Sequence, residues 1–104
     1  MATTGILGVA DLATATNTSV YTVPAASSAS FSVNFANRGS LSTNVRLAIC
    51  SVSSPANSEY IIFDTVIPPN GSFERTGLTA QDGKIVVAYS SSANVSVQVY
   101  GYEA

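Results

Sequence analysis

Six carboxylates are the side chains of this chain that could carry acid–base chemistry. They are Asp11, Glu59, Asp64, Glu74, Asp82 and Glu103. Two carboxylates that flank a glycosidic bond can act as general acid and general base, so a glycosidase is the enzyme class that they could serve. Asp82 precedes Gly83, where a turn explains it, and Glu103 lies in the C-terminal tail. We expect Glu59, Asp64 and Glu74 to be outward strand residues and predict no catalytic residue.

Glu74 and Arg75 form the one place where two charged residues are adjacent, in the stretch NGSFERTGL (70–78). The Asn-Gly pair that follows two prolines indicates a turn, and a strand begins after it. Neighbouring residues of a strand point to opposite faces, so Glu74 and Arg75 cannot pair with each other. We expect Glu74 to meet Arg46 across strands instead.

Histidine is absent from the chain and cysteine occurs once. The missing histidine removes the usual general base, the usual catalytic triad and the commonest metal ligand together. One cysteine cannot build a structural zinc site, and Cys50 is expected to be a small buried residue at the end of a strand. GILG (5–8) lacks the spacing and the Lys-Ser/Thr ending of a phosphate-binding loop. We therefore expect a protein that is not an enzyme and binds no cofactor or metal.

The charge pattern argues against nucleic-acid and membrane partners. The formal net charge is −2, and the four Lys and Arg residues are scattered singly. The basic surface of a nucleic-acid binder and the polybasic patch of a membrane binder are both missing. The apolar runs are too short to span a bilayer, and residues 1–16 lack the features of a signal peptide. Synthesis in the cytoplasm is the expectation.

Alternation of apolar and polar residues with period 2 is the dominant pattern of the chain. It is clearest in ASFSVNFAN (29–37), TNVRLAIC (43–50) and NVSVQVYGY (94–102). Such alternation predicts antiparallel strands with one buried and one solvated face. Two further runs, 59–67 and 84–90, are apolar on both faces. They are either central strands or strands whose outward faces meet a partner.

Turn signals rich in Gly, Pro, Asn and Ser separate these runs at regular intervals. About seven or eight short strands with such spacing predict an all-β fold, an antiparallel β-sandwich of the jelly-roll or immunoglobulin-like kind. Residues 19–104 are expected to form this sandwich. Residues 1–18 are expected to form an extended N-terminal arm that becomes ordered on a neighbouring protein.

Five segments follow one another in a characteristic order: VYTVPA, VNFANRG, VRLAI, YIIFDTVIPPNGSFERTGL and ANVSVQVYGYEA. Together they resemble a small domain of tailed bacteriophages that is frequent in phages of cyanobacteria and marine bacteria. The resemblance extends from about Ser19 to the end of the chain and depends on the whole set rather than on one motif. It implies a virion surface protein, of the kind associated with capsid decoration (cement), head knobs, fibres, or neck and tail appendages, without catalytic residues.

The function implied by this resemblance is stabilisation of the capsid exterior by a cement protein that is synthesised in the host cytoplasm. Its partners would be the major capsid protein or other virion proteins. Monomer, dimer and trimer are all open, and a homotrimer is favoured because quasi-threefold junctions are common attachment places. Ile62 stands where the family is expected to carry a polar residue, which marks it as an interface residue. The full set expected at the interface is Ile6, Leu7, Val9, Leu12, Tyr60, Ile62, Tyr100 and Tyr102.

Two other functions fit the same sequence. The domain could belong to the neck, tail or fibres of the virion, with a role in assembly or host attachment. It could instead be a carbohydrate-binding module, because β-sandwiches often present aromatic platforms to sugars. Saccharide binding would then depend on Tyr100 or Tyr102.

Overall fold

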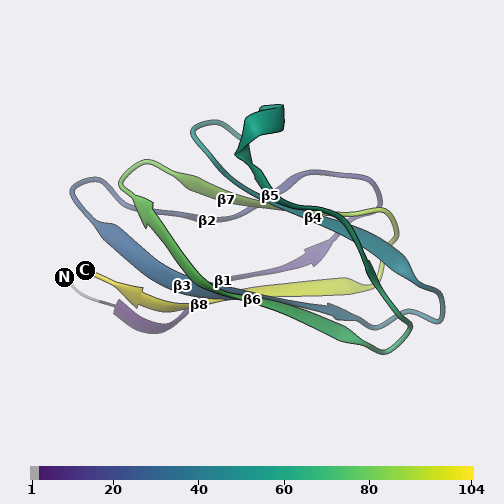
Figure 1. Ribbon diagram of the computed structural model, residues 1–104. Helices are drawn as coiled ribbons and strands as arrows, with labels where there is room; N and C mark the ends of the chain where they lie inside the picture. Colours follow the sequence, from purple (N-terminus) through teal and green to yellow (C-terminus); the bar gives the residue numbers. More distant parts are fainter. Residues whose placement is uncertain (1–2) are drawn as a thin grey trace.

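The computed structural model describes residues 3–104, which form two four-stranded antiparallel sheets packed face to face (Figure 1). Sheet A has the strand order β1-β8-β3-β6, and sheet B has the order β2-β7-β4-β5. The strands are β1 (Thr3–Leu12), β2 (Thr18–Thr22), β3 (Ser28–Asn37), β4 (Thr43–Cys50), β5 (Tyr60–Ile67), β6 (Ser72–Gln81), β7 (Ile85–Ser90) and β8 (Val95–Glu103). One 3-10 helix, η1 (Asn57–Glu59), precedes β5, and no helix of the described residues could cross a membrane.

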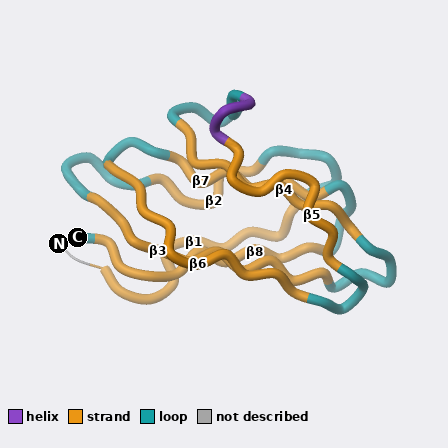
Figure 2. Tube along the Cα trace, in the orientation of Figure 1, coloured by secondary structure: helices purple, strands orange, loops and turns teal. Residues whose placement is uncertain are grey.

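The strand pairing identifies the sandwich as a jelly roll. The first strand pairs with the last, β2 with β7, β3 with β6, and β4 with β5, all antiparallel. The chain is therefore one long antiparallel ribbon that is folded over into two layers, as the tube in Figure 2 shows. The predicted β-sandwich is confirmed, and of the two kinds considered the topology is that of the jelly roll.

The core lies between the sheets and consists of the apolar residues predicted from the alternation. In β3, Phe31, Val33 and Phe35 are buried, and in β8 the three alternate valines are buried in the same way. Val45 and Leu47 of β4 enter the core from the opposite sheet. The alternation is reliable here because β3, β4, β7 and β8 are inner strands that pair with each other in an unbroken register.

Residues 3–12 of the expected N-terminal arm are instead part of the sandwich. They form β1, which pairs with β8 over its whole length and places Thr3 opposite Glu103. Gly8 allows this packing, because a Cβ atom there would lie 2.3 Å from the carbonyl oxygen of Val20 on β2. The two edge strands β1 and β2 thus approach each other closely and bring the two sheets together along this side. The prediction of a free arm over 1–18 was wrong for this stretch.

Every edge strand contains a β-bulge, and the extra residue always lies on the edge strand rather than on its inner partner. The bulges occur at Leu7 in β1, at Val20 in β2, between Arg75 and Leu78 in β6, and twice in β5. Bulges twist an edge and interrupt its row of free backbone groups, which hinders edge-to-edge association of sheets. The faces of this sandwich are therefore better suited than its edges to bind a partner.

The run 84–90, apolar on both faces, is the inner strand β7. Its outward residue Val87 packs with Ala48 and Cys50 in a second small cluster on the outer face of sheet B, flanked by Tyr60. η1 and the loop around it stand on this side of sheet B (Figure 1). Cys50 is buried at the end of β4, as predicted, and burial raises the pKa of its thiol.

Candidate functional site

A cluster of aromatic and charged side chains lies on the outer face of sheet B. It is centred on Arg46 of β4, which has Tyr89 of β7 as its cross-strand neighbour on one side and β5 on the other. We call it the Arg46 platform and define it as Arg46, Tyr60, Phe63, Asp64 and Tyr89.

A bulge in β5 builds the platform. Between the pairs Val45–Thr65 and Leu47–Ile62, the edge strand has one residue more than β4, so Phe63 and Asp64 both lie opposite Arg46. Asp64 has a φ of 55°, a left-handed conformation that is uncommon for a residue other than glycine. Two consecutive residues that would point apart in a regular strand are thus both exposed on the outer face.

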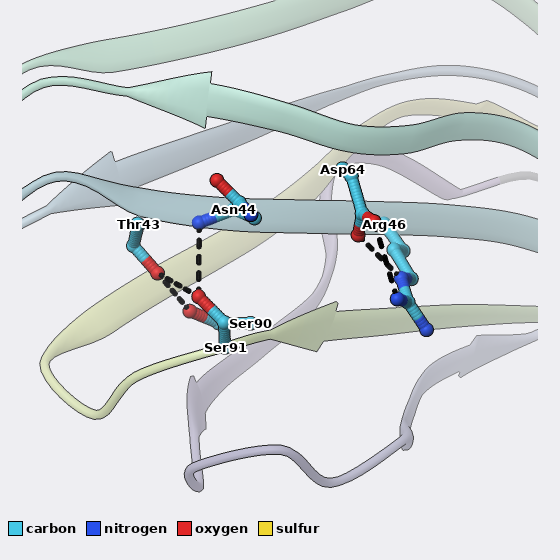
Figure 3. Close-up of polar contacts among 6 residues, drawn as sticks. All are labelled: Thr43, Asn44, Arg46, Asp64, Ser90 and Ser91. Atoms are coloured by element: carbon cyan, nitrogen blue, oxygen red, sulfur yellow. Dashed lines mark hydrogen bonds and ion pairs between the residues drawn. The ribbon is translucent and has the colours of Figure 1, made fainter.

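The guanidinium of Arg46 is held by three neighbours. Its Nε donates a hydrogen bond to Oδ1 of Asp64 at 2.7 Å and its Nη2 donates to Oδ2 at 3.3 Å (Figure 3). The guanidinium carbon lies 4.1 Å from the ring centre of Phe63 and 4.6 Å from that of Tyr89. The hydrogen bond to Asp64 raises the pKa of Arg46 and so favours the charged form of its guanidinium.

Phe63 is the most exposed aromatic residue of the platform, with 57% of its surface open to solvent. Tyr60 meets its ring edge-on, with ring centres 5.1 Å apart and planes inclined by 79°. Asn57 of η1 lines a shallow hollow together with these two rings. The platform therefore offers an open aromatic surface with polar groups along its rim.

A cluster of hydroxyl groups lies at the other end of β4, where Thr43 and Ser90 are buried (Figure 3). Thr43 Oγ1 is 2.9 Å from Ser90 Oγ and 3.2 Å from Ser91 Oγ, and it accepts a hydrogen bond from Ser92 Oγ at 2.8 Å. Ser91 Oγ also accepts a 3.0 Å hydrogen bond from the backbone N–H of Asn44. These contacts attach the loop after β7 to the start of β4, which is a structural role.

Half of the residues expected at an interface gather on the outer face of sheet A. Tyr100 of β8 lies opposite Ile6 of β1, and Val9 lies one row further along the same strand pair. Ile6 and Val9 are 56% and 60% exposed, and Tyr102, next in the outward row of β8, is 49% exposed. We call these four residues the β1–β8 patch.

The other four expected interface residues lie elsewhere. Leu12 and Ile62 are 2% and 4% exposed, so their assignment to an interface was wrong, and both belong to the core. Leu7 packs against the same core from β1, and Tyr60 belongs to the Arg46 platform on the other sheet. Leu12 was expected in an arm but lies on a paired strand, and Ile62 was marked by the resemblance but points into the core.

The carboxylates are spread over the molecule rather than paired with each other. Asp11 forms an ion pair with Arg38, and Asp64 forms one with Arg46. The expected contact between Glu74 and Arg46 is absent, because Glu74 lies opposite Asn34 in sheet A whereas Arg46 belongs to sheet B. Within residues 3–104, no group of three His, Cys, Asp or Glu side chains could hold a metal ion.

One feature of the sequence pointed to the Arg46 platform. The run 59–67, which contains Tyr60, Phe63 and Asp64, is apolar on both faces. The pairing of Arg46 with Asp64 depends on the bulge and could not be read from the alternation. No protein-family model matches the chain, and comparison with curated protein sequences finds no match.

Proposed function

We propose that this chain is a structural surface protein of a tailed-phage virion that stabilises the capsid exterior as a cement protein. The observation that carries the proposal is the β1–β8 patch, a set of apolar and aromatic side chains exposed on the outer face of sheet A. Aromatic residues are enriched and charged residues depleted in the centre of protein interfaces, and this composition fits the patch. The major capsid protein is the proposed partner.

The surroundings of the β1–β8 patch support docking through the outer face of sheet A rather than through its edge. The neighbouring outward positions of sheet A carry Ser32, Asn34 and Gln98, which are uncharged and can form hydrogen bonds across an interface. The bulge at Leu7 interrupts the free edge of β1. A partner would therefore contact the side chains of this face rather than extend the sheet.

The fold and the sequence resemblance also support a place on the virion surface. Jelly rolls are common in viral capsid proteins and in lectins, although a fold alone does not define a function. The ordered segments that resemble the phage domain include strands of both sheets, namely β3, β6 and β8 of sheet A and β2, β4 and β5 of sheet B. A rigid small sandwich attached to several capsid subunits would add contacts across their junctions and resist internal pressure.

Binding of the recombinant chain to phage heads from which the endogenous protein has been removed tests the proposal. We expect the wild-type chain to rebind at the density of the capsid lattice and to restore the heat resistance of the heads. The variant with Ile6→Ser and Val9→Ser should bind at least about tenfold more weakly. Phe63→Ala, an equally exposed apolar position on the opposite sheet, is the matched control and should rebind normally.

Four results would contradict this proposal. The protein could be missing from mature heads, or its removal could leave their heat resistance unchanged. A copy number that matches one neck or tail ring, rather than the head lattice, would move the domain to that part of the virion. Equal loss of binding in the β1–β8 variant and in the Phe63 control would show that the patch is not the docking surface.

A further inference from the structure

We propose that the Arg46 platform binds a neutral saccharide, through a pyranose ring with two adjacent free hydroxyl groups. The platform lies on sheet B, whereas the proposed docking patch lies on sheet A, so the two sites occupy opposite faces of the sandwich. This inference is independent of the proposed virion function, because it concerns a property of the isolated chain.

Phe63 provides the surface on which a sugar ring would stack. Phe63 is 57% exposed, and Tyr60 meets its ring edge-on. The Arg46 guanidinium lies over one face, 4.1 Å from the ring centre, so the sugar would stack on the other face. The hollow lined by Asn57, Tyr60 and Phe63 adds an amide that can donate and accept hydrogen bonds. Small-molecule sites typically combine aromatic walls with a few oriented polar groups, and a pyranose has an apolar C–H face to match such a wall.

The ion pair beside the ring supplies the polar half of the site. A guanidinium has five N–H donors, and Arg46 uses only its Nε and one hydrogen of Nη2 for Asp64. The Asp64 carboxylate in turn keeps lone pairs that these two bonds do not occupy. Side-chain exposures of 27% for Arg46 and 41% for Asp64 show that both groups reach solvent. Each of two adjacent hydroxyls could accept from Arg46 or donate to Asp64.

The charges of the platform favour a neutral ligand over an anionic one. Asp64 already compensates the positive charge of Arg46, and the other members of the platform, Tyr60, Phe63 and Tyr89, are uncharged. A phosphate or sulfate group would have to compete with Asp64 for the guanidinium. A nucleic acid would in addition require a basic surface, and the chain has a net charge of −2.

The platform is rigid before any ligand binds. Arg46 is held between the rings of Phe63 and Tyr89 and by two hydrogen bonds, so little side-chain freedom remains to be lost on binding. The bulge that creates it keeps Asp64 in a left-handed conformation at φ 55°. Strained residues of this kind concentrate at binding sites, where a surrounding structure maintains them for a functional reason.

Titration of the ¹⁵N-labelled full chain with methyl glucopyranoside, galactopyranoside and mannopyranoside, followed by NMR, tests the inference. We expect saturable shifts of the Asn57, Phe63 and Asp64 signals with at least one of these sugars, in the millimolar range of weak single-site binding. Phe63→Ala and Arg46→Lys should each weaken binding at least about tenfold. Lysine keeps the charge of Arg46 but loses its planar fork of donors.

Tyr102→Ala, on the opposite sheet, is the matched control and should bind the same sugar normally; its spectrum and those of the platform variants report whether each protein is folded. The absence of saturable shifts with all three sugars would overturn the inference. So would shifts that map to Tyr100 and Tyr102, or tighter binding of a sulfated glycoside. Preference for an apolar peptide would identify the platform as a protein-binding surface instead. Apart from shifts at Tyr100 and Tyr102, which belong to the β1–β8 patch, these outcomes leave capsid docking unaffected, because it is tested with β1–β8 variants.

Discussion

The hydroxyl of Tyr21 on β2 donates a 2.6 Å hydrogen bond to Oε1 of Glu103 on β8, and this contact joins sheet B to sheet A. Burial raises the pKa of Tyr21 well above its ordinary value, and the hydrogen bond to Glu103 raises it further. The folded protein therefore keeps a proton on Tyr21 at pH values at which the unfolded chain loses it.

The first prediction follows from this difference in proton binding. An unfolded tyrosine ionises near pH 10, so the stabilisation by Tyr21 is fully present below about pH 10 and is lost as the pH rises above it. Urea denaturation at about pH 8 and about pH 10.5 should show a smaller decrease in the free energy of unfolding for Tyr21→Phe than for the wild type. Tyr102→Phe, at an exposed position, should behave like the wild type. Equal decreases in all three proteins would contradict the prediction.

The second prediction concerns the bulge at Asp64, whose φ of 55° suits Asn but not a β-branched residue. Asp64→Asn should lose only the partly exposed ion pair with Arg46, about 1 kcal/mol or less. Asp64→Val should lose about 2 kcal/mol or more, because its backbone clashes at positive φ. Urea denaturation measures both. Gln98→Val, on the regular strand β8, is the control, and a similar loss there would argue against backbone strain.

The inner strands show how much of the fold can be predicted from the sequence. In β3 and β8, apolar and polar residues alternate, and the buried apolar side chains are those expected. In β4, Val45 and Leu47 are buried as expected, but Ala48 is also buried, in the cluster on the outer face. A strand with a regular register has only two faces, so hydrophobicity alone assigns each residue to one of them. The jelly-roll order could not be deduced in this way, because alternation says nothing about which strands are neighbours.

The edge strands show why the candidate sites were harder to predict. A bulge inserts one residue and disturbs the alternation, as at Phe63 and Asp64, which are both exposed. Leu12 was assigned to an interface because its segment was expected to be an arm, and Ile62 because of the sequence resemblance, although both are buried. The predicted contact between Arg46 and Glu74 was wrong for a different reason. Glu74 and Arg46 lie in different sheets, and the assignment of strands to sheets depends on long-range contacts that one sequence does not reveal.

The third prediction tests the close contact between β1 and β2 that makes β1 part of the sandwich. Gly8→Ala would place a Cβ atom 2.3 Å from the Val20 carbonyl oxygen, a backbone atom that cannot move away without displacing β2. We expect a loss of about 2 kcal/mol or more in the free energy of unfolding, together with faster amide hydrogen exchange in β1. Thr4→Ala, an exposed position on the same strand, should change stability by less than about 0.5 kcal/mol. If both variants had the same stability, β1 would not be packed against β2 as described.

The fourth prediction addresses the buried hydroxyl of Thr43, which contacts the side-chain oxygens of Ser90, Ser91 and Ser92. Thr43→Val keeps the shape of the side chain but removes the acceptor that Ser92 Oγ uses. Ser90 Oγ keeps its 2.8 Å hydrogen bond to the Ser92 carbonyl, so the loss should be limited to about 1–3 kcal/mol. Thermal and urea denaturation measure this loss, and amide exchange should accelerate in the loop after β7.

Thr22→Val, at an exposed position of β2, is the matched control and should remain within about 0.5 kcal/mol of the wild type. If Thr43→Val left the stability unchanged, the hydroxyl cluster would not be what holds this loop. Its backbone contacts would hold it instead, such as the 2.9 Å hydrogen bond from Ser91 N–H to the Asn44 carbonyl.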